Sequence, residues 1–217
     1  PATSTSDRPQ RSTALVLLTG LWVVIFFAAL FAPPLLDDAD ATHANAARHM
    51  ALSGDWVTLK VNGIRYLEKA PLPYWLDAIS FHIFGFNAFA AHLPQAIGVL
   101  LLALLGYHWS RRAYGDITAF YTGLAILTSA GVFLFTRIYI PEVLLSLFLS
   151  LALYCLLRTL EEENLKERVI LSRREARVAT SEISHSRKAY PYIMWTALAL
   201  AVLTKGPVAL VLFSLIA

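Results

Sequence analysis

The sequence predicts an all-α polytopic membrane protein, built as a bundle of transmembrane helices. Hydrophobic residues make up 57% of the 217 residues and charged residues only 15%, whereas a soluble domain is about half apolar and about a quarter charged. The mean hydropathy is +0.58. Apolar runs recur along the chain at close to the length of about 20 residues that carries a helix across a bilayer.

The first elements are a polar tail and a membrane anchor. Residues 1–12 form the tail, which we expect in the cytoplasm, and the apolar run 13–36 predicts transmembrane helix 1. This run is too long for the core of a signal peptide, and no small-residue cleavage site follows it, so it indicates an uncleaved anchor. Because the sequence starts at Pro1 and stops inside an apolar run at Ala217, we expect an N-terminal piece of a longer protein.

The next segment, 37–92, is polar and amphipathic, and we expect it to form a loop outside the membrane core. Residues 40–52 predict a helix. Asn62-Gly63 between two short runs of strand-forming residues predicts a small hairpin. Residues 73–84 combine aromatic and polar side chains, which is typical of a helix lying at the membrane interface.

The remainder, 93–217, predicts transmembrane helices 2 to 5 and the start of helix 6. The apolar runs are 93–109, 117–135, 143–157, 190–204 and 208–217. The charged segment 158–189 predicts a solvated helical loop. The single cysteine, Cys155, lies in an apolar run, which excludes an intrachain disulfide and a cysteine-based metal site.

The distribution of basic residues predicts the orientation. With a cytoplasmic N-terminus, 12 of the 18 Lys and Arg residues lie on the cytoplasmic side, as the positive-inside rule requires. They are Arg8, Arg11, Arg111, Arg112, Arg158, Lys166, Arg168, Arg173, Arg174, Arg177, Arg187 and Lys188. Segment 37–92, segment 137–142 and Lys205 then share the outer side. Because basic residues flank the spans, the net charge of +3 does not indicate a nucleic-acid partner.

Charged residues from separate parts of the chain therefore converge on one membrane face. They are Asp37, Asp38, Asp40, Glu68, Lys69, Arg137, Glu142 and Lys205. A charge inside a membrane segment costs about 2.5–3.5 kcal/mol on insertion scales, so such residues usually face a polar cavity. Carboxylates serve as general bases or bind cations, and basic side chains hold phosphates. The set suits transfer from a phosphate-activated donor.

Each of these residues also has a purely structural interpretation. Asp37 and Asp38 could mark a solvated helix end, and Asp40 could cap the following helix. Glu68 and Lys69 could form a solvated pair, and Arg137 could anchor its helix at the interface. Glu142 could favour the dipole at the start of a helix, and Lys205 could extend to the headgroups. His43 and His49 lie six positions apart, which does not favour a shared metal site.

Several motifs occur in an order that resembles a known family. They are segments 44–50, 53–58, 62–76, 84–94 and 203–207, together with Arg137 and Pro141-Glu142. The chain resembles the bacterial dolichyl-phosphate-mannose–protein mannosyltransferase-like superfamily, especially the aminoarabinose lipid A transferases. The resemblance runs from about Leu15 onward, and segment 54–76 is its most specific part.

The resemblance implies a GT-C-class glycosyltransferase of the plasma (inner) membrane. Such enzymes move a sugar on the outer face from a polyprenyl-phosphate carrier to a lipid, glycan or protein acceptor. The family's essential acid maps to Asp38 or Asp40. Its usual adjacent Asp-Glu pair reads Asp38-Ala39-Asp40 here, which leaves the principal acid open. A divalent metal is possible, since GT-C enzymes vary in metal use.

The mechanism we expect is direct displacement at the anomeric carbon with inversion. Lys69 and Lys205, with Arg137, would neutralise the leaving phosphate. Asp38 or Asp40 would orient the acceptor, or take its proton if it is a hydroxyl. Supporting roles are expected for Asp37, Lys60, Tyr66, Glu68 and Glu142. Tyr66, Tyr74 and Trp75 could contact the sugar or the lipid, or could belong to the aromatic belt at the membrane interface.

Two alternatives remain open at this level. One is a protein O-mannosyltransferase-type enzyme, which differs only in the acceptor. The other is a membrane transporter, which would place discontinuous helices near the bilayer midplane and carry an internal repeat. The sequence shows no internal repeat, and its charges lie near one membrane face.

Overall fold

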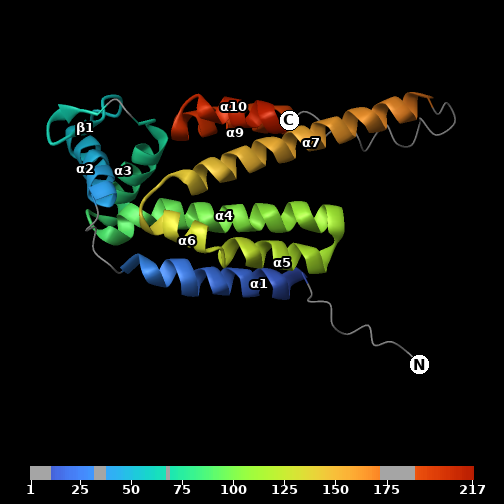
Figure 1. The fold of residues 1–217 in the computed structure, drawn as a ribbon, viewed down its shortest axis with the longest axis horizontal. Helices are drawn as coiled ribbons and strands as arrows, with labels where there is room; N and C mark the ends of the chain where they lie inside the picture. The colour runs from blue at the N-terminus through green and yellow to red at the C-terminus, as the bar shows by residue number, and fades with distance from the viewer. Residues whose placement is uncertain (1–10, 32–37, 67–68, 172–188) are drawn as a thin grey trace.

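The computed structural model describes residues 11–31, 38–66, 69–171 and 189–217, with the backbone alone for 38–40 and 165–171. Long helices lie side by side along the long axis, and α2, β1 and α3 gather at one end of them (Figure 1). Apart from one hairpin, the elements of the described chain are helical. The predicted all-α architecture is confirmed.

The elements follow one another in this order: α1 (Arg11–Trp22), π-helical η1 (Val23–Phe27), 3₁₀-helical η2 (Ala28–Phe31), α2 (Asp38–Ser53), β1 (Lys60–Val61), β2 (Ile64–Arg65), α3 (Leu72–Phe84), α4 (Ala88–Tyr114), α5 (Asp116–Leu127), α6 (Ala130–Arg137), α7 (Glu142–Leu171), α9 (Ala189–Lys205) and α10 (Val208–Ile216).

Three stretches of the described chain are long and apolar enough to cross a membrane: Arg11–Phe31, Ala88–Tyr114 and Glu142–Asn164. A fourth is added if α5 and α6, which are bent by 41° at their junction, count as one span. The apolar run 117–135 thus forms two helices, α5 and α6, with a break between them. The chain breaks because Ser129 caps α6, its hydroxyl accepting from the Val132 N–H at 3.5 Å.

The helices α4 and α7 are longer than the apolar runs that predicted them. α4 starts early because the Asn87 side chain accepts from the Ala90 N–H at 2.8 Å and caps the helix. α7 continues to Leu171 beyond its apolar part. Arg158 forms ion pairs with Glu161 and Glu162 one turn further along, and such pairs support a helix in polar sequence.

The first span is held against α4 and α5 by one buried stripe. The residues of this stripe lie four positions apart and share a core with residues of both helices. They are Ala14, Leu18, Trp22, Phe26 and Leu30. The Trp22 indole N–H donates to the Ala96 carbonyl at 2.8 Å. This bond gives the buried indole the polar partner that it needs in an apolar environment.

The hairpin predicted at Asn62-Gly63 is present, with shorter strands than the sequence suggested. Lys60 pairs with Arg65 and Val61 with Ile64 in antiparallel register. Asn62 and Gly63 have φ of 51° and 83°, as a two-residue hairpin turn with two left-handed positions requires. The Asn45 amide donates to the Asn62 side chain at 2.8 Å and ties the turn to α2.

The loop before the hairpin is shaped by Asp55. Its carboxylate accepts from the backbone N–H of Thr58 at 2.9 Å and of Val57 at 3.2 Å. These bonds stabilise the ionised form, so the pKa of Asp55 lies below its usual value. The loop joins α2 to the hairpin. Together with α3, these elements form a small layer with its own core, rich in alanine and aromatic side chains.

Close packing of α1 on α5 depends on Gly123. A Cβ at this position would lie 2.7 Å from Cδ1 of Leu18, which is itself buried. We expect Gly123→Ala to lower the unfolding free energy by about 1–3 kcal/mol through overpacking. The measurement is the melting temperature of the purified protein in detergent.

Gly20 on α1 provides the matched control for that substitution. No atom lies within 4 Å of a Cβ placed there, and alanine is favoured over glycine in a helix by about 1 kcal/mol. Gly20→Ala should therefore raise the melting temperature or leave it unchanged. Equal losses in both variants would contradict the overpacking explanation.

Candidate active site

A polar cavity of about 440 Å³ lies where α2 and α3 meet the α6–α7 turn and the α9–α10 turn. Each water in the liquid occupies about 30 Å³, so the cavity has room for a phosphate group and a sugar ring. Its lining residues are His43, Lys69, Ala70, Pro73, Tyr74, Tyr139, Ile140, Pro141, Glu142, Thr204 and Lys205.

An ion pair between Glu142 and Lys205 forms one side of the cavity. Glu142 is in the first turn of α7 and Lys205 in the last turn of α9, so each charge faces the helix end whose dipole favours it. Gly206, with φ of 84°, ends α9 and turns the chain into α10. The pair therefore joins two helix ends at the mouth of the cavity.

Lys69 is exposed and lines the same cavity from the segment before α3. Three of the residues predicted from the sequence, Lys69, Glu142 and Lys205, thus border one space. Among the residues that the structure describes, the charged side chains of the cavity are two lysines and one glutamate. An anion such as a phosphate fits this balance better than a cation does.

Three other predicted residues do not line this cavity. The Arg137 guanidinium donates to the Ala29 carbonyl and so links α6 to the end of the first span. Lys60 lies 3.8 Å from the carboxylate of Asp55. Tyr66 packs against the α2–α3 core, and its N–H donates to the Leu59 carbonyl.

The predicted acids lie at the edge of what the structure describes. Asp37 and Glu68 fall outside the described residues. Asp38 and Asp40 form the first turn of α2, where the helix dipole favours negative charge. His43, less than one turn beyond Asp40, lines the cavity. The backbone therefore directs the start of α2 toward this end of the molecule.

Two aromatic residues also line the cavity. Tyr74, for which we expect a sugar or lipid contact, is 1% exposed, and its ring belongs to the α2–α3 core. Tyr139 is fully buried, with φ of 57°. Non-glycine residues rarely adopt such a conformation, and strained backbone of this kind recurs at functional sites. No motif in the sequence marks it.

A buried carboxyl, Asp77, lies on α3, in the layer that α2, the hairpin and α3 form. It is 1% exposed, and its Oδ2 has no hydrogen-bond partner among the described residues. Burial raises the pKa of Asp77 well above its usual value, because a charge is costly in an apolar environment. In the sequence, the signal for this buried carboxyl is an acidic residue within the aromatic amphipathic run 73–84.

The described residues contain no group of three or more His, Cys, Asp or Glu side chains that could hold a metal ion. Near the cavity, His43 and Glu142 are side chains of the type that bind metals. A divalent cation commonly needs more protein or substrate ligands than these two provide. A bound divalent metal therefore stays a prediction from the resemblance alone.

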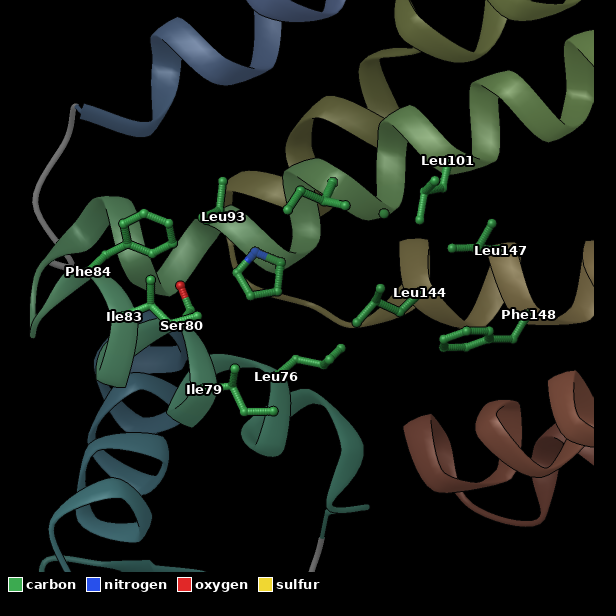
Figure 2. A pocket seen from close by; sticks show the side chains of 13 residues that line it. Leu76, Ile79, Ser80, Ile83, Phe84, Leu93, Leu101, Leu144, Leu147 and Phe148 are labelled. Atoms are coloured by element: carbon green, nitrogen blue, oxygen red, sulfur yellow. The ribbon is translucent and has the colours of Figure 1, made fainter.

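An apolar groove of about 330 Å³ lies between α3, α4 and α7, of which α3 and α7 also border the cavity. Figure 2 shows Leu76 and Ile79 of α3 opposite Leu144 and Leu147 of α7. Phe148 extends the α7 side, and residues of α4 form the third wall. The first residues of α3 and α7 border the polar cavity, and the following turns border the groove.

Comparison with known proteins gives a consistent picture. Residues 68–172 match the family model described as dolichyl-phosphate-mannose-protein mannosyltransferase. An undecaprenyl phosphate-alpha-4-amino-4-deoxy-L-arabinose arabinosyl transferase 2 of Pseudomonas fluorescens is 33% identical over 129 residues, which are 59% of this chain and 22% of that protein. The enzyme of the same name from Proteus mirabilis is 29% identical, with coverages of 71% and 28%.

The fold has a solved counterpart. The crystal structure of ArnT from Cupriavidus metallidurans bound to undecaprenyl phosphate aligns with a TM-score of 0.74 and 26% identity, covering 95% of this chain and 36% of that one. Its apo form aligns with a TM-score of 0.73 and 27% identity, with coverages of 93% and 36%. The chain therefore spans about a third of the length of these solved relatives.

Proposed function

We propose, from the resemblance of this chain to the GT-C-class glycosyltransferases of the aminoarabinose transferase and protein mannosyltransferase superfamily, that it belongs to a membrane glycosyltransferase. The enzyme moves a sugar from a polyprenyl-phosphate carrier to a lipid, glycan or protein acceptor. We further propose a pentose as the sugar, because the names of the relatives specify 4-amino-4-deoxy-L-arabinose.

The observation that carries this proposal is that a polar cavity and an apolar groove border successive turns of α3 and α7. The cavity offers Lys69 and Lys205 to an anion, and the groove along the next turns of α3 and α7 offers only apolar side chains and Ser80. A ligand with a phosphate head and a hydrocarbon chain satisfies both surfaces at once. A polyprenyl-phosphate sugar is such a ligand, and undecaprenyl phosphate is bound in the related crystal structure.

The reaction proposed is displacement at the anomeric carbon. An acceptor oxygen forms the new bond to this carbon, the bond to the phosphate oxygen breaks, and its electron pair stays on the phosphate. Lys69 and Lys205 stabilise the charge that develops there. Asp38 or Asp40 takes the acceptor's proton when the acceptor is a hydroxyl, and a phosphate acceptor needs no base.

The proposed orientation places the N-terminus in the cytoplasm and the cavity on the outer face of the plasma (inner) membrane. Arg111 and Arg112 support it, because they lie in the last turn of α4, and Arg158 lies 16 residues along α7 from Glu142, which lines the cavity. Basic residues concentrate on the cytoplasmic side of membrane proteins.

Sugar transfer by the full-length protein tests the function. With a radiolabelled polyprenyl-phosphate sugar and a membrane-lipid acceptor that offers a hydroxyl, we expect turnover, and Asp40→Asn should lower kcat about 100-fold or more if Asp40 is the general base. Asp38→Asn is the matched variant, since both residues lie in the first turn of α2. If neither variant loses activity, the carboxylates have no catalytic role, and absence of turnover in the wild type would reject the function.

A further inference from the structure

A further polar pocket, of about 370 Å³, lies between α4 and α7, and the proposed reaction gives it no role. Within the described chain, the charged side chains that line it are Arg112, Arg158 and Glu161. Arg158 lies 16 residues along α7 from Glu142, which lines the polar cavity. At the rise of an α-helix, this separation is about 24 Å. This pocket, called the arginine pocket below, is therefore separate from the polar cavity.

Helical periodicity places an aromatic ring beside each arginine of the pocket. Trp109 precedes Arg112 by three positions on α4, and Tyr154 precedes Arg158 by four positions on α7, so each pair shares one face of its helix. The two rings meet edge to face, with centroids 5.6 Å apart. Tryptophan and tyrosine beside basic residues are typical of the level at which a span meets the lipid headgroups.

The guanidinium of Arg158 is buried and only partly paired. Its side chain is 11% exposed, and it forms ion pairs with Glu161 and, at 4.0 Å, with Glu162. The ring of Tyr190 on α9 lies 5.4 Å from its central carbon. Its Nε–H has no hydrogen-bond partner among the described residues. Because a buried donor without a partner is unfavourable, an acceptor supplied by a ligand in this pocket would stabilise the side chain.

Arg112 and Glu161 form the more exposed side of the pocket, with side chains 53% and 47% exposed. Their nearest nitrogen and oxygen atoms are 3.9 Å apart, which is longer than a hydrogen bond. Glu161 meets both arginines through the same oxygen, Oε2. Within the described part of the chain, this arrangement leaves N–H donors of Arg112 and the Oε1 acceptor of Glu161 for a ligand.

These groups complement a head group that contains both a phosphate and an ammonium. Guanidinium groups from two helices suit a phosphate, whose oxygens accept charge-assisted hydrogen bonds. The free Oε1 of Glu161 suits an ammonium that carries N–H donors. A choline head group has no such donors, and a purely anionic head group would place its negative charge beside the Glu161 carboxylate.

We propose that the arginine pocket binds a phospholipid with an ethanolamine head group. The phosphate lies between Arg112 and Arg158, and the ammonium donates to Oε1 of Glu161. The acyl chains run past Leu157, an exposed apolar residue of the same pocket. The inference goes beyond the proposed function and does not depend on it, since the two pockets share no lining residue.

Native mass spectrometry of the full-length, delipidated protein in detergent tests this site. The probes are phosphatidylethanolamine, phosphatidylcholine and phosphatidylglycerol with identical acyl chains. We expect the wild type to bind phosphatidylethanolamine about tenfold more tightly than either of the others. Arg112→Ala, at a half-exposed position, should weaken phosphatidylethanolamine binding about tenfold by removing donors to the phosphate.

Glu161→Gln separates recognition of the ammonium from recognition of the phosphate. The substitution keeps the shape of the side chain and removes its charge. It should reduce the preference for phosphatidylethanolamine over phosphatidylcholine to about threefold or less, because a neutral acceptor forms a weaker bond to an ammonium. It should also strengthen phosphatidylglycerol binding, because the repulsion of an anionic head group is gone. A residue that only supports the pocket wall would not change the two preferences in opposite directions.

Arg111, the neighbour of Arg112, provides the matched control. It forms an ion pair with Asp116 and lies outside the lining of the arginine pocket. Arg111→Ala should leave all three affinities unchanged. Equal losses in Arg111→Ala and Arg112→Ala would overturn the site, because they would indicate a general attraction of basic residues for lipid. A wild type without preference for phosphatidylethanolamine, or an unchanged preference in Glu161→Gln, would overturn the assignment of the head group.

Discussion

Replacing Lys205 with alanine should lower kcat/KM for sugar transfer at least 100-fold. Loss of one preorganised group that stabilises developing charge commonly has an effect of this size. Here a second effect adds to it, because Glu142, the ion-pair partner of Lys205, would be left facing the donor phosphate with its own negative charge. Transfer from a radiolabelled polyprenyl-phosphate sugar measures the loss.

A double-mutant cycle separates these two effects. Glu142→Gln in the Lys205→Ala background removes the repulsion and should recover about tenfold of the lost activity, which corresponds to about 1.4 kcal/mol. Arg65→Ala, at an exposed position of β2, is the control for loss of a basic residue outside the cavity. Activity that falls by the same factor in the single and the double variant would show that Glu142 does not oppose the phosphate.

Replacing Lys69 with methionine should have an effect of comparable size, about 100-fold in kcat/KM. Lys69 is exposed to the cavity and lies directly before α3, and methionine keeps most of the length of the side chain while removing the charge. Lys69→Arg should retain part of the activity, because guanidinium also binds phosphate. Steady-state kinetics and binding of undecaprenyl phosphate measure the two effects.

The pattern of losses distinguishes a role in binding from a role in the chemical step. If Lys69 holds the phosphate equally before and during transfer, Lys69→Met raises KM and leaves kcat unchanged. If it responds to the charge that develops, kcat falls. Turnover and affinity both at the level of the wild type in Lys69→Met would remove Lys69 from the site.

The elements that the sequence predicted well depend on short stretches of chain. The hairpin forms because Asn62 and Gly63 tolerate the positive φ that its turn requires. α3 forms within one residue of its predicted start, since its amphipathic pattern is local. By contrast, the break at Ser129 and the extension of α7 depend on a cap and on ion pairs, which hydropathy does not record.

The sequence by itself determined that the chain is a membrane-embedded helical protein and that Lys69, Glu142 and Lys205 belong to one end of it. Hydropathy and the count of spans suffice for this, because transfer into a membrane depends on composition over about 20 residues. Only the tertiary structure decided which polar side chains meet. It directs Arg137 to the Ala29 carbonyl and brings His43 into the cavity, because side-chain direction is set by packing between elements distant in sequence.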